Sequence, residues 1–205
     1  MSNLDRALAE ISAIRGQMAR ATEFCGYGPA TFAITGLLAL AAAIGQSVRL
    51  KDPAGHIAAW LTLWLAVAAV SATLIGFEMI TRSRRIHSDL ADEMIRTAVE
   101  QFLPASAAGG LITVVLLRFA PQSLPLLPGL WQICFSLGVF ASCRFLPRPL
   151  ALVGVWYMGC GFLALAVSSG PLAFSPWIMG LAFGVGQLLV AALLQQSLGA
   201  GDDQG

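Results

Sequence analysis

Long apolar runs alternate with short polar stretches along most of the chain. A helix needs about 20 mostly apolar residues to cross the hydrocarbon core of a bilayer, and each run is close to that length. Small residues recur inside the runs and allow helices to approach one another closely in a membrane. We therefore predict an all-α, polytopic integral membrane protein, with a six-transmembrane-helix bundle at 29–198. The predicted spans are 30–48, 57–80, 104–119, 126–143, 150–167 and 177–198.

The N-terminal stretch, 1–28, is amphipathic rather than uniformly apolar. Its apolar side chains repeat at steps of three, four or seven residues, which is the spacing of a helix seam. Its polar face carries acidic as well as basic residues, whereas helices that lie on a membrane surface usually present Lys and Arg. Packing on a protein is therefore favoured over a position in the membrane interface. The seam consists of Leu4, Ile11, Ile14 and Met18.

A second cytosolic amphipathic helix is predicted at 82–102. Neither Gly nor Pro occurs between Phe77 and Leu103, so the preceding span is expected to run into this helix or to bend sharply onto it. Pro104 is expected to begin the next span. The polar face of the helix is acidic, and an anionic membrane surface would repel it. We therefore expect its apolar seam to pack against a protein, either the N-terminal helix of the same chain or that of a second copy. The seam consists of Ile86, Leu90, Met94 and Ile95.

Composition agrees with a membrane protein. Hydrophobic residues make up 57% of the chain and charged residues 11%, with a mean hydropathy of +0.76, whereas soluble domains carry about 25% charged residues. Basic residues are few and form no run beside aromatic ones, which argues against nucleic-acid binding. The four Cys have no metal-ligand or redox spacing, and His56 and His87 are expected on opposite faces of the membrane. We therefore expect no cofactor and no metal.

The basic residues gather on one side of the predicted bundle. Nine of the twelve Lys and Arg fall in the N-terminal segment or in the loops after the second and fourth spans, and three fall on the other side. The positive-inside rule then places both termini in the cytosol. The expected location is the bacterial cytoplasmic membrane. The polar tail, 199–205, has no periodicity and is expected to be disordered.

Gln187 is the polar residue nearest the middle of a predicted span. It continues a stripe along one helix face that also holds Gly180, Gly184 and Gln195. The two glycines permit close approach of another helix, and the Gln amide can then bond across the contact. One interpretation makes Gln187 a contact between helices of one bundle or of two copies. The other makes it a ligand for a substrate or an ion at mid-membrane. The first is favoured because such bonds are common in membrane proteins.

Glu78 is the only acidic residue inside a predicted span, and intramembrane carboxylates are candidates for function. Arg82 follows four residues later, in the order that favours an ion pair on a helix. An interfacial pair between Glu78 and Arg82 is therefore preferred. No nucleophile and base, paired carboxylates, zinc-protease motif or phosphate-binding loop can be found in the sequence.

The leading functional prediction is a non-enzymatic regulatory, scaffold or assembly protein whose cytosolic helices dock a partner. Its expected partners are membrane lipid, another protein and a second copy of the chain, with no nucleic acid. The alternative is a small transporter or channel for a neutral or weakly polar solute, which requires a cavity lined by Gln187, Gln132, Ser136 or Tyr157. A third class is a membrane enzyme that acts on a lipid. Its only candidate catalytic groups at the cytosolic face would be Glu78, Arg82 and His87.

Overall fold

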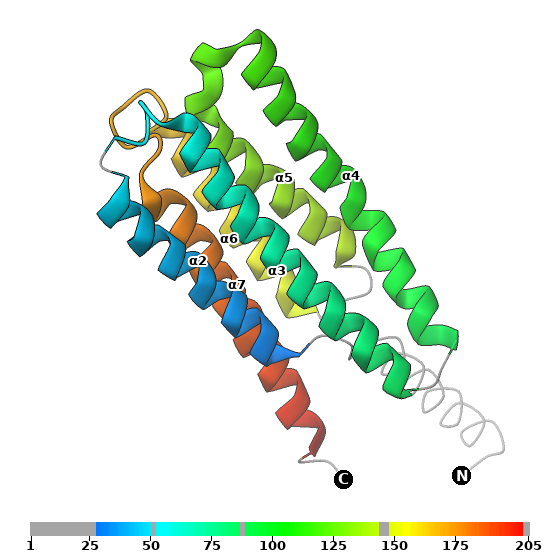
Figure 1. Cartoon of the computed structure of the whole chain (residues 1–205). Coiled ribbons are helices and arrows are strands. Elements are labelled where there is room, and N and C mark those ends of the chain that lie inside the picture. Colours follow the sequence, from blue (N-terminus) through cyan, green and yellow to red (C-terminus); the bar gives the residue numbers. More distant parts are fainter. Residues whose placement is uncertain (1–27, 51, 87–88, 144–147, 203–205) are drawn as a thin grey trace, which may run out of the picture.

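The computed structural model describes residues 28–50, 52–86, 89–143 and 148–202, with the backbone alone at 82–86, 89–98, 148 and 197–202. Within these ranges the chain is all-helical, without strands, which confirms the predicted all-α class. Successive helices run antiparallel and form an elongated bundle (Figure 1). They are α2 (Pro29–Arg49), α3 (Ile57–Ile86), α4 (Asp89–Phe119), α5 (Leu127–Ser142), α6 (Ala151–Ala166) and α7 (Pro176–Asp202), with short 3-10 turns η1 (Pro121–Leu126) and η2 (Arg148–Leu150).

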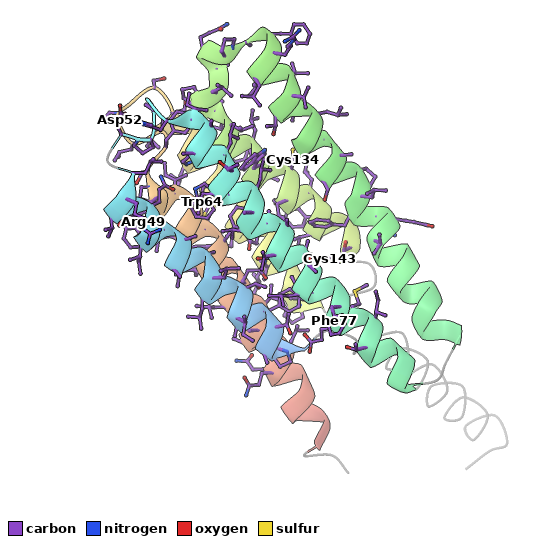
Figure 2. The ribbon with its side chains drawn as sticks, in the orientation of Figure 1. Arg49, Asp52, Trp64, Phe77, Cys134 and Cys143 are labelled. Carbon is purple, nitrogen blue, oxygen red and sulfur yellow. The ribbon has the colours of Figure 1, made fainter. Side chains whose placement is uncertain are left out.

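The described helices fit a membrane protein. Five helical segments are long and apolar enough to cross a bilayer, and the sixth, α6, is apolar but has only 16 residues. Large apolar side chains cover the outside of the bundle, such as Phe77, which is 69% exposed. Arg49 and Asp52 lie together at one end (Figure 2). This end, which carries the 50–56 and 167–175 connections, is called the upper end below (Figure 1). The six-span count and the orientation stay predictions.

Two boundaries differ from the predicted ones. The predicted helix 82–102 is divided, because α3 ends at Ile86 and α4 begins at Asp89; residues 87 and 88 lie outside the described residues. Pro104 does not begin a helix but lies inside α4. A proline costs a helix one hydrogen bond and a local clash, and in an apolar environment the neighbouring turns keep the backbone helical.

The C-terminal tail also differs in part from its prediction. Residues 199–202 belong to α7, which continues to Asp202, and 203–205 lie outside the described residues. No proline stops this helix after Pro176. Pro29 and Pro176, in contrast, stand where α2 and α7 begin, a position that suits proline because the first turn of a helix leaves backbone N–H groups unpaired. At α2 the preceding Gly28 has an extended backbone, as a residue before a helix does.

Glycines allow two pairs of helices to touch through their backbones. A Cβ atom added to Gly36 of α2 would lie 2.9 Å from the carbonyl oxygen of Gly184 in α7. A Cβ atom added to Gly129 of α5 would lie 2.8 Å from the carbonyl oxygen of Gly161 in α6. The pairs α2–α7 and α5–α6 are the most extensively packed in the bundle, whereas α3 and α4 contact each other little.

A buried polar contact fastens the upper end. The indole nitrogen of Trp64 donates to the side-chain oxygen of Gln46 at 2.9 Å, and the Gln46 amide nitrogen donates to the carbonyl oxygen of Phe174 at 3.0 Å. Both Gln46 and Trp64 are almost fully buried. This chain of bonds joins α2, α3 and the connection before α7.

Candidate functional site

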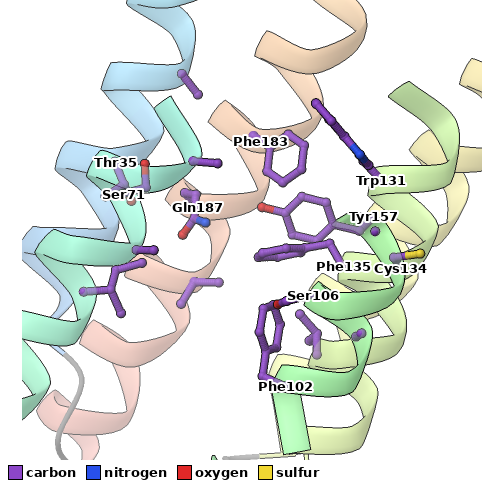
Figure 3. Close-up of a pocket in the computed structure, with 18 of the residues that line it drawn as sticks. Thr35, Ser71, Phe102, Ser106, Trp131, Cys134, Phe135, Tyr157, Phe183 and Gln187 are labelled. Carbon is purple, nitrogen blue, oxygen red and sulfur yellow. The ribbon is translucent and has the colours of Figure 1, made fainter. Parts of the chain in front are cut away.

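A cavity of about 680 Å³ lies inside the bundle, and all six α-helices contribute to its wall (Figure 3). Its volume falls within the range of about 300–1,000 Å³ that is usual for sites of drug-sized molecules. The lining is mostly aliphatic and aromatic, and none of the described residues that line it is charged. Most polar members of the wall are hydroxyls. This chemistry suits an uncharged molecule.

Three of the lining hydroxyls are already used within their own helices. Thr35 donates to the carbonyl oxygen of Phe32, Thr113 to that of Gly109, and Ser142 to that of Gly138. Such local bonds satisfy a hydroxyl without any ligand. These positions therefore add little polarity to the cavity.

Tyr157 and Gln187 differ from these residues because each has a buried oxygen without a hydrogen-bond partner. Tyr157 of α6 is 0% exposed and Gln187 of α7 is 7% exposed, and both line the cavity. The Tyr157 ring lies between those of Phe135 and Phe183, and its hydroxyl points toward the helix that carries Gln187 (Figure 3). A buried polar atom without a partner costs about 1–3 kcal/mol. Both oxygens have almost no accessible surface, so a molecule in the cavity would recover that free energy only where the neighbouring side chains shift to expose them.

The position of the Tyr157 hydroxyl depends on the glycine beside Gln187. A Cβ atom added to Gly186 would lie 2.5 Å from the Tyr157 hydroxyl oxygen, so a larger residue at 186 would force the ring to move. Aromatic neighbours hold the ring on its other sides. Phe135 lies 4.7 Å and Phe183 lies 5.2 Å from it, measured between ring centroids. Tyr157 is therefore fixed by packing rather than by a hydrogen bond.

Three aromatic residues pack together between the cavity wall and the upper end of the bundle. Trp60 stacks on Trp131 with 5.6 Å between ring centroids, and it meets the edge of Phe174 at 5.2 Å. Trp131 is fixed because its indole nitrogen donates to the hydroxyl oxygen of Thr113 at 2.8 Å. Trp60 itself is fully buried. We refer to Trp60, Trp131 and Phe174 as the aromatic layer.

The side of the cavity between α3 and α4 is more open. Leu65 of α3 and Val99 and Leu103 of α4 line the cavity and are also 50%, 51% and 60% exposed. Residues can combine these two properties only where a cavity meets the surface. The weak contact between α3 and α4 agrees with an opening at this place.

The predicted glycine stripe lies where α7 meets α2. Cβ atoms added to Gly180 and Gly184 would collide with Ala43 and Leu40 of α2, so this contact lies within one bundle. Gln187 follows on the same helix but makes no hydrogen bond that the described residues record. Gln195 is exposed. The predicted alternatives for Gln187 were a helix contact or a ligand-binding group; its Cβ atom lies against Gly36 of α2, and the residue also lines the cavity.

Two other predicted cavity residues take part in packing instead. Gln132 is 0% exposed, and its amide nitrogen donates to the carbonyl oxygen of Ile178 at 3.0 Å, whereas its side-chain oxygen has no hydrogen-bond partner. Ser136 donates to the carbonyl oxygen of Gly154 at 2.7 Å. Neither residue is among those that line the cavity. Of the four residues named for the transport alternative, the cavity thus brings together Tyr157 and Gln187.

The structure describes only some of the remaining predicted site residues. The Glu78 carboxylate lies against Gly28, close to the beginning of α2. The side chain of Arg82 lies outside the described residues, and the Glu78–Arg82 pair stays a prediction. The partner seams also lie outside the described side chains: Leu4, Ile11, Ile14, Met18, Ile86, Leu90, Met94 and Ile95.

The described part of the chain contains no group of three His, Cys, Asp or Glu side chains that could hold a metal ion. Cys134 lines the cavity, whereas Cys143 and Cys160, both half-buried, do not. Comparison with family models, with curated proteins and with solved structures finds no match to this chain.

Proposed function

We propose that this chain is a small, non-enzymatic integral membrane protein that binds an uncharged, weakly polar molecule in its bundle cavity. The observation that carries the proposal is the presence of two partnerless buried oxygens, on Tyr157 and Gln187, in an otherwise apolar cavity of about 680 Å³. A charged ligand would leave its charge unpaired among these residues, at a high cost in free energy.

A carrier fits this cavity better than a channel does. The aromatic layer blocks the way toward the upper end, and a continuous aqueous path through the bundle would have to cross it. A carrier needs only a site that is accessible first from one side of the membrane and then from the other. In this proposal all six apolar helices cross the membrane, and both termini lie in the cytosol in accordance with the distribution of Lys and Arg.

Cys134 provides a direct test of occupancy, because it lies in the cavity wall. Substitution of Cys25, Cys143 and Cys160 by Ser leaves it as the only thiol. Decanol, which is neutral and weakly polar, should slow its reaction with N-ethylmaleimide, and decanoate at pH 8 should not. A matched chain that keeps Cys160 alone should respond to neither probe. Equal rates at Cys134 with and without decanol would contradict the proposal.

A second measurement separates carrier from channel. Planar bilayers that contain the purified protein should show no stepwise conductance, because the aromatic layer interrupts the path. Conductance steps that become larger or longer-lived on Trp131→Ala would instead identify the layer as a gate and refute the carrier assignment. The predicted role of the amphipathic helices as partner-docking segments is independent of both measurements.

A further inference from the structure

We propose that the ligand is a single-chain amphiphile with an uncharged head, such as a monoacylglycerol, and that it enters the cavity sideways from the bilayer between α3 and α4. This inference rests on the proposed function and adds to it a ligand class and a route. Four features of the described residues lead to it: the opening, its small-residue borders, its depth and the polarity within.

The opening exists because α3 and α4 pack on different neighbours. α3 packs on α2, whereas α4 packs on α5, and the two make little contact with each other. Some of the cavity-lining residues on each helix are at least half exposed, among them Leu65 on α3 and Leu103 on α4. The cavity is therefore continuous with the surface of the bundle along this side.

Small residues border the opening on both helices. On α3 they recur at every fourth position, as Ala68, Ala72 and Gly76, and on α4 Ser106 and Gly110 have the same spacing. Faces of this kind usually let two helices pack closely in a membrane. Here both faces line the cavity instead, and a Cβ atom added to Gly76 or Gly110 would meet no other group within 4 Å. The borders thus leave space that a slender apolar chain can occupy.

The opening lies at the depth of the hydrocarbon core. The membrane-compatible parts of the two helices are Ile57–Thr81 and Val99–Phe119, and the bordering residues fall well within them. The aromatic layer lies between the cavity and the upper end. A molecule dissolved in the lipid therefore meets the opening directly, whereas one dissolved in water does not.

The interior defines the chemistry of the ligand. The Gln187 amide oxygen accepts a hydrogen bond, and the Tyr157 hydroxyl can donate or accept one, so a hydroxyl-bearing head can use both once the neighbouring side chains shift to expose them. The rings of Phe102, Phe135 and Phe183 form an apolar surface beside them. The cavity of about 680 Å³ belongs to the size class of drug-sized ligands, which favours one acyl chain over a whole phospholipid.

Photo-crosslinking tests the route. Liposomes that hold the full chain would be mixed with a monoacylglycerol carrying a diazirine in its acyl chain and irradiated, and crosslinked peptides mapped by mass spectrometry. Crosslinks should fall on cavity residues such as Phe135 and Phe183. Gly76→Trp and Gly110→Trp place an indole in the opening and should remove most of this yield, because the indole occupies the space that the acyl chain needs. Gly45→Trp and Gly159→Trp are matched controls, because these glycines also have open space around them but do not line the cavity. Their yields should equal that of the wild type.

Head-group recognition has its own readout. Tyr157→Phe combined with Gln187→Leu removes both polar groups and should lower the cavity yield of the diazirine monoacylglycerol by about three- to tenfold, the equivalent of one or two hydrogen bonds. The yield of a diazirine alkane without a head should not fall. A merely structural defect would lower both yields equally, and this result would overturn the head-group assignment.

The outcomes distinguish the inference from the proposed function. If decanol protects Cys134 but the monoacylglycerol does not reach cavity residues, the ligand class is wrong while the proposed function stands. If the two opening variants crosslink as well as their controls, the route is wrong. If neither probe occupies the cavity, the proposed function itself fails.

Discussion

The contact between α2 and α7 predicts opposite effects for two glycine substitutions on one helix. Gly36 and Gly45 both lie within α2, so their helix propensities are comparable. A Cβ atom at Gly36 would lie 2.9 Å from the carbonyl oxygen of Gly184 and 3.2 Å from Cβ of Gln187, whereas one at Gly45 would meet nothing within 4 Å. Gly36→Ala should therefore destabilise the bundle, and Gly45→Ala should leave it unchanged or stabilise it.

The difference in the free energy of unfolding between the two variants measures the steric cost of the added methyl group. Replacement of Gly by Ala in a helix stabilises it by up to about 1 kcal/mol, and this contribution is shared by both positions. Overpacking by one methyl group in a close-packed interior costs about 1–3 kcal/mol. The Gly184 oxygen belongs to the backbone of α7 and cannot rotate away, unlike a flexible side chain. The free energy of unfolding should thus differ by about 1–3 kcal/mol between Gly36→Ala and Gly45→Ala.

Unfolding in mixed micelles by increasing fractions of dodecyl sulfate, followed by circular dichroism, measures this difference. Both variants should retain the wild-type helix content before the transition, which shows that they fold. A transition for Gly36→Ala at the same detergent fraction as that for Gly45→Ala would refute the reasoning. In that case α2 and α7 would not approach through their backbones at this point.

Three further results are expected. Gln46→Leu leaves the Trp64 indole and a loop carbonyl without partners, and should lower the free energy of unfolding by about 1–3 kcal/mol in the same assay; no loss would contradict the buried contact. Gly186→Ala displaces the ring end of Tyr157, and should weaken protection of the cavity thiol by decanol while helix content is retained; unchanged protection would mean that the ring does not shape the site. In an otherwise cysteine-free chain, Asp52→Cys should react with a membrane-impermeant maleimide added outside intact cells, and a lack of reaction would invert the proposed topology.

Much of the fold follows from simple patterns in the sequence. Apolar runs of nearly bilayer length predicted where α2, α5, α6 and α7 lie, and Pro29 and Pro176 stand where two of them begin. The absence of Gly and Pro between Phe77 and Leu103 was a poor guide to the boundary between α3 and α4. A helix can end without Gly or Pro when packing and solvation of its last turn determine where it stops. It can also continue through a proline, as α4 does at Pro104.

The candidate site was only partly predictable. Gln187 could be identified because a single amide in an apolar run is costly in free energy unless it forms a hydrogen bond or binds a ligand. The sequence alone could not decide whether Gln187 serves packing or ligand binding. In the structure the glycines on the same helix face α2, while the Gln187 side chain lines the cavity. Gln132 and Ser136 have equally polar side chains in similar runs but bond to neighbouring backbones. Sequence alone does not reveal which polar side chain will find such a carbonyl oxygen.

The brevity of α6 has a consequence for the surrounding lipid. At a rise of about 1.5 Å per residue, its 16 residues span about 24 Å, less than the roughly 30 Å of a typical hydrocarbon core. Leu152 and Leu163 near its two ends are 65% and 69% exposed, so in the proposed six-span arrangement acyl chains cover this helix. Such hydrophobic mismatch thins the membrane locally. The protein should accordingly partition into thinner membrane regions, and short-chain lipids should suit it better than long-chain ones.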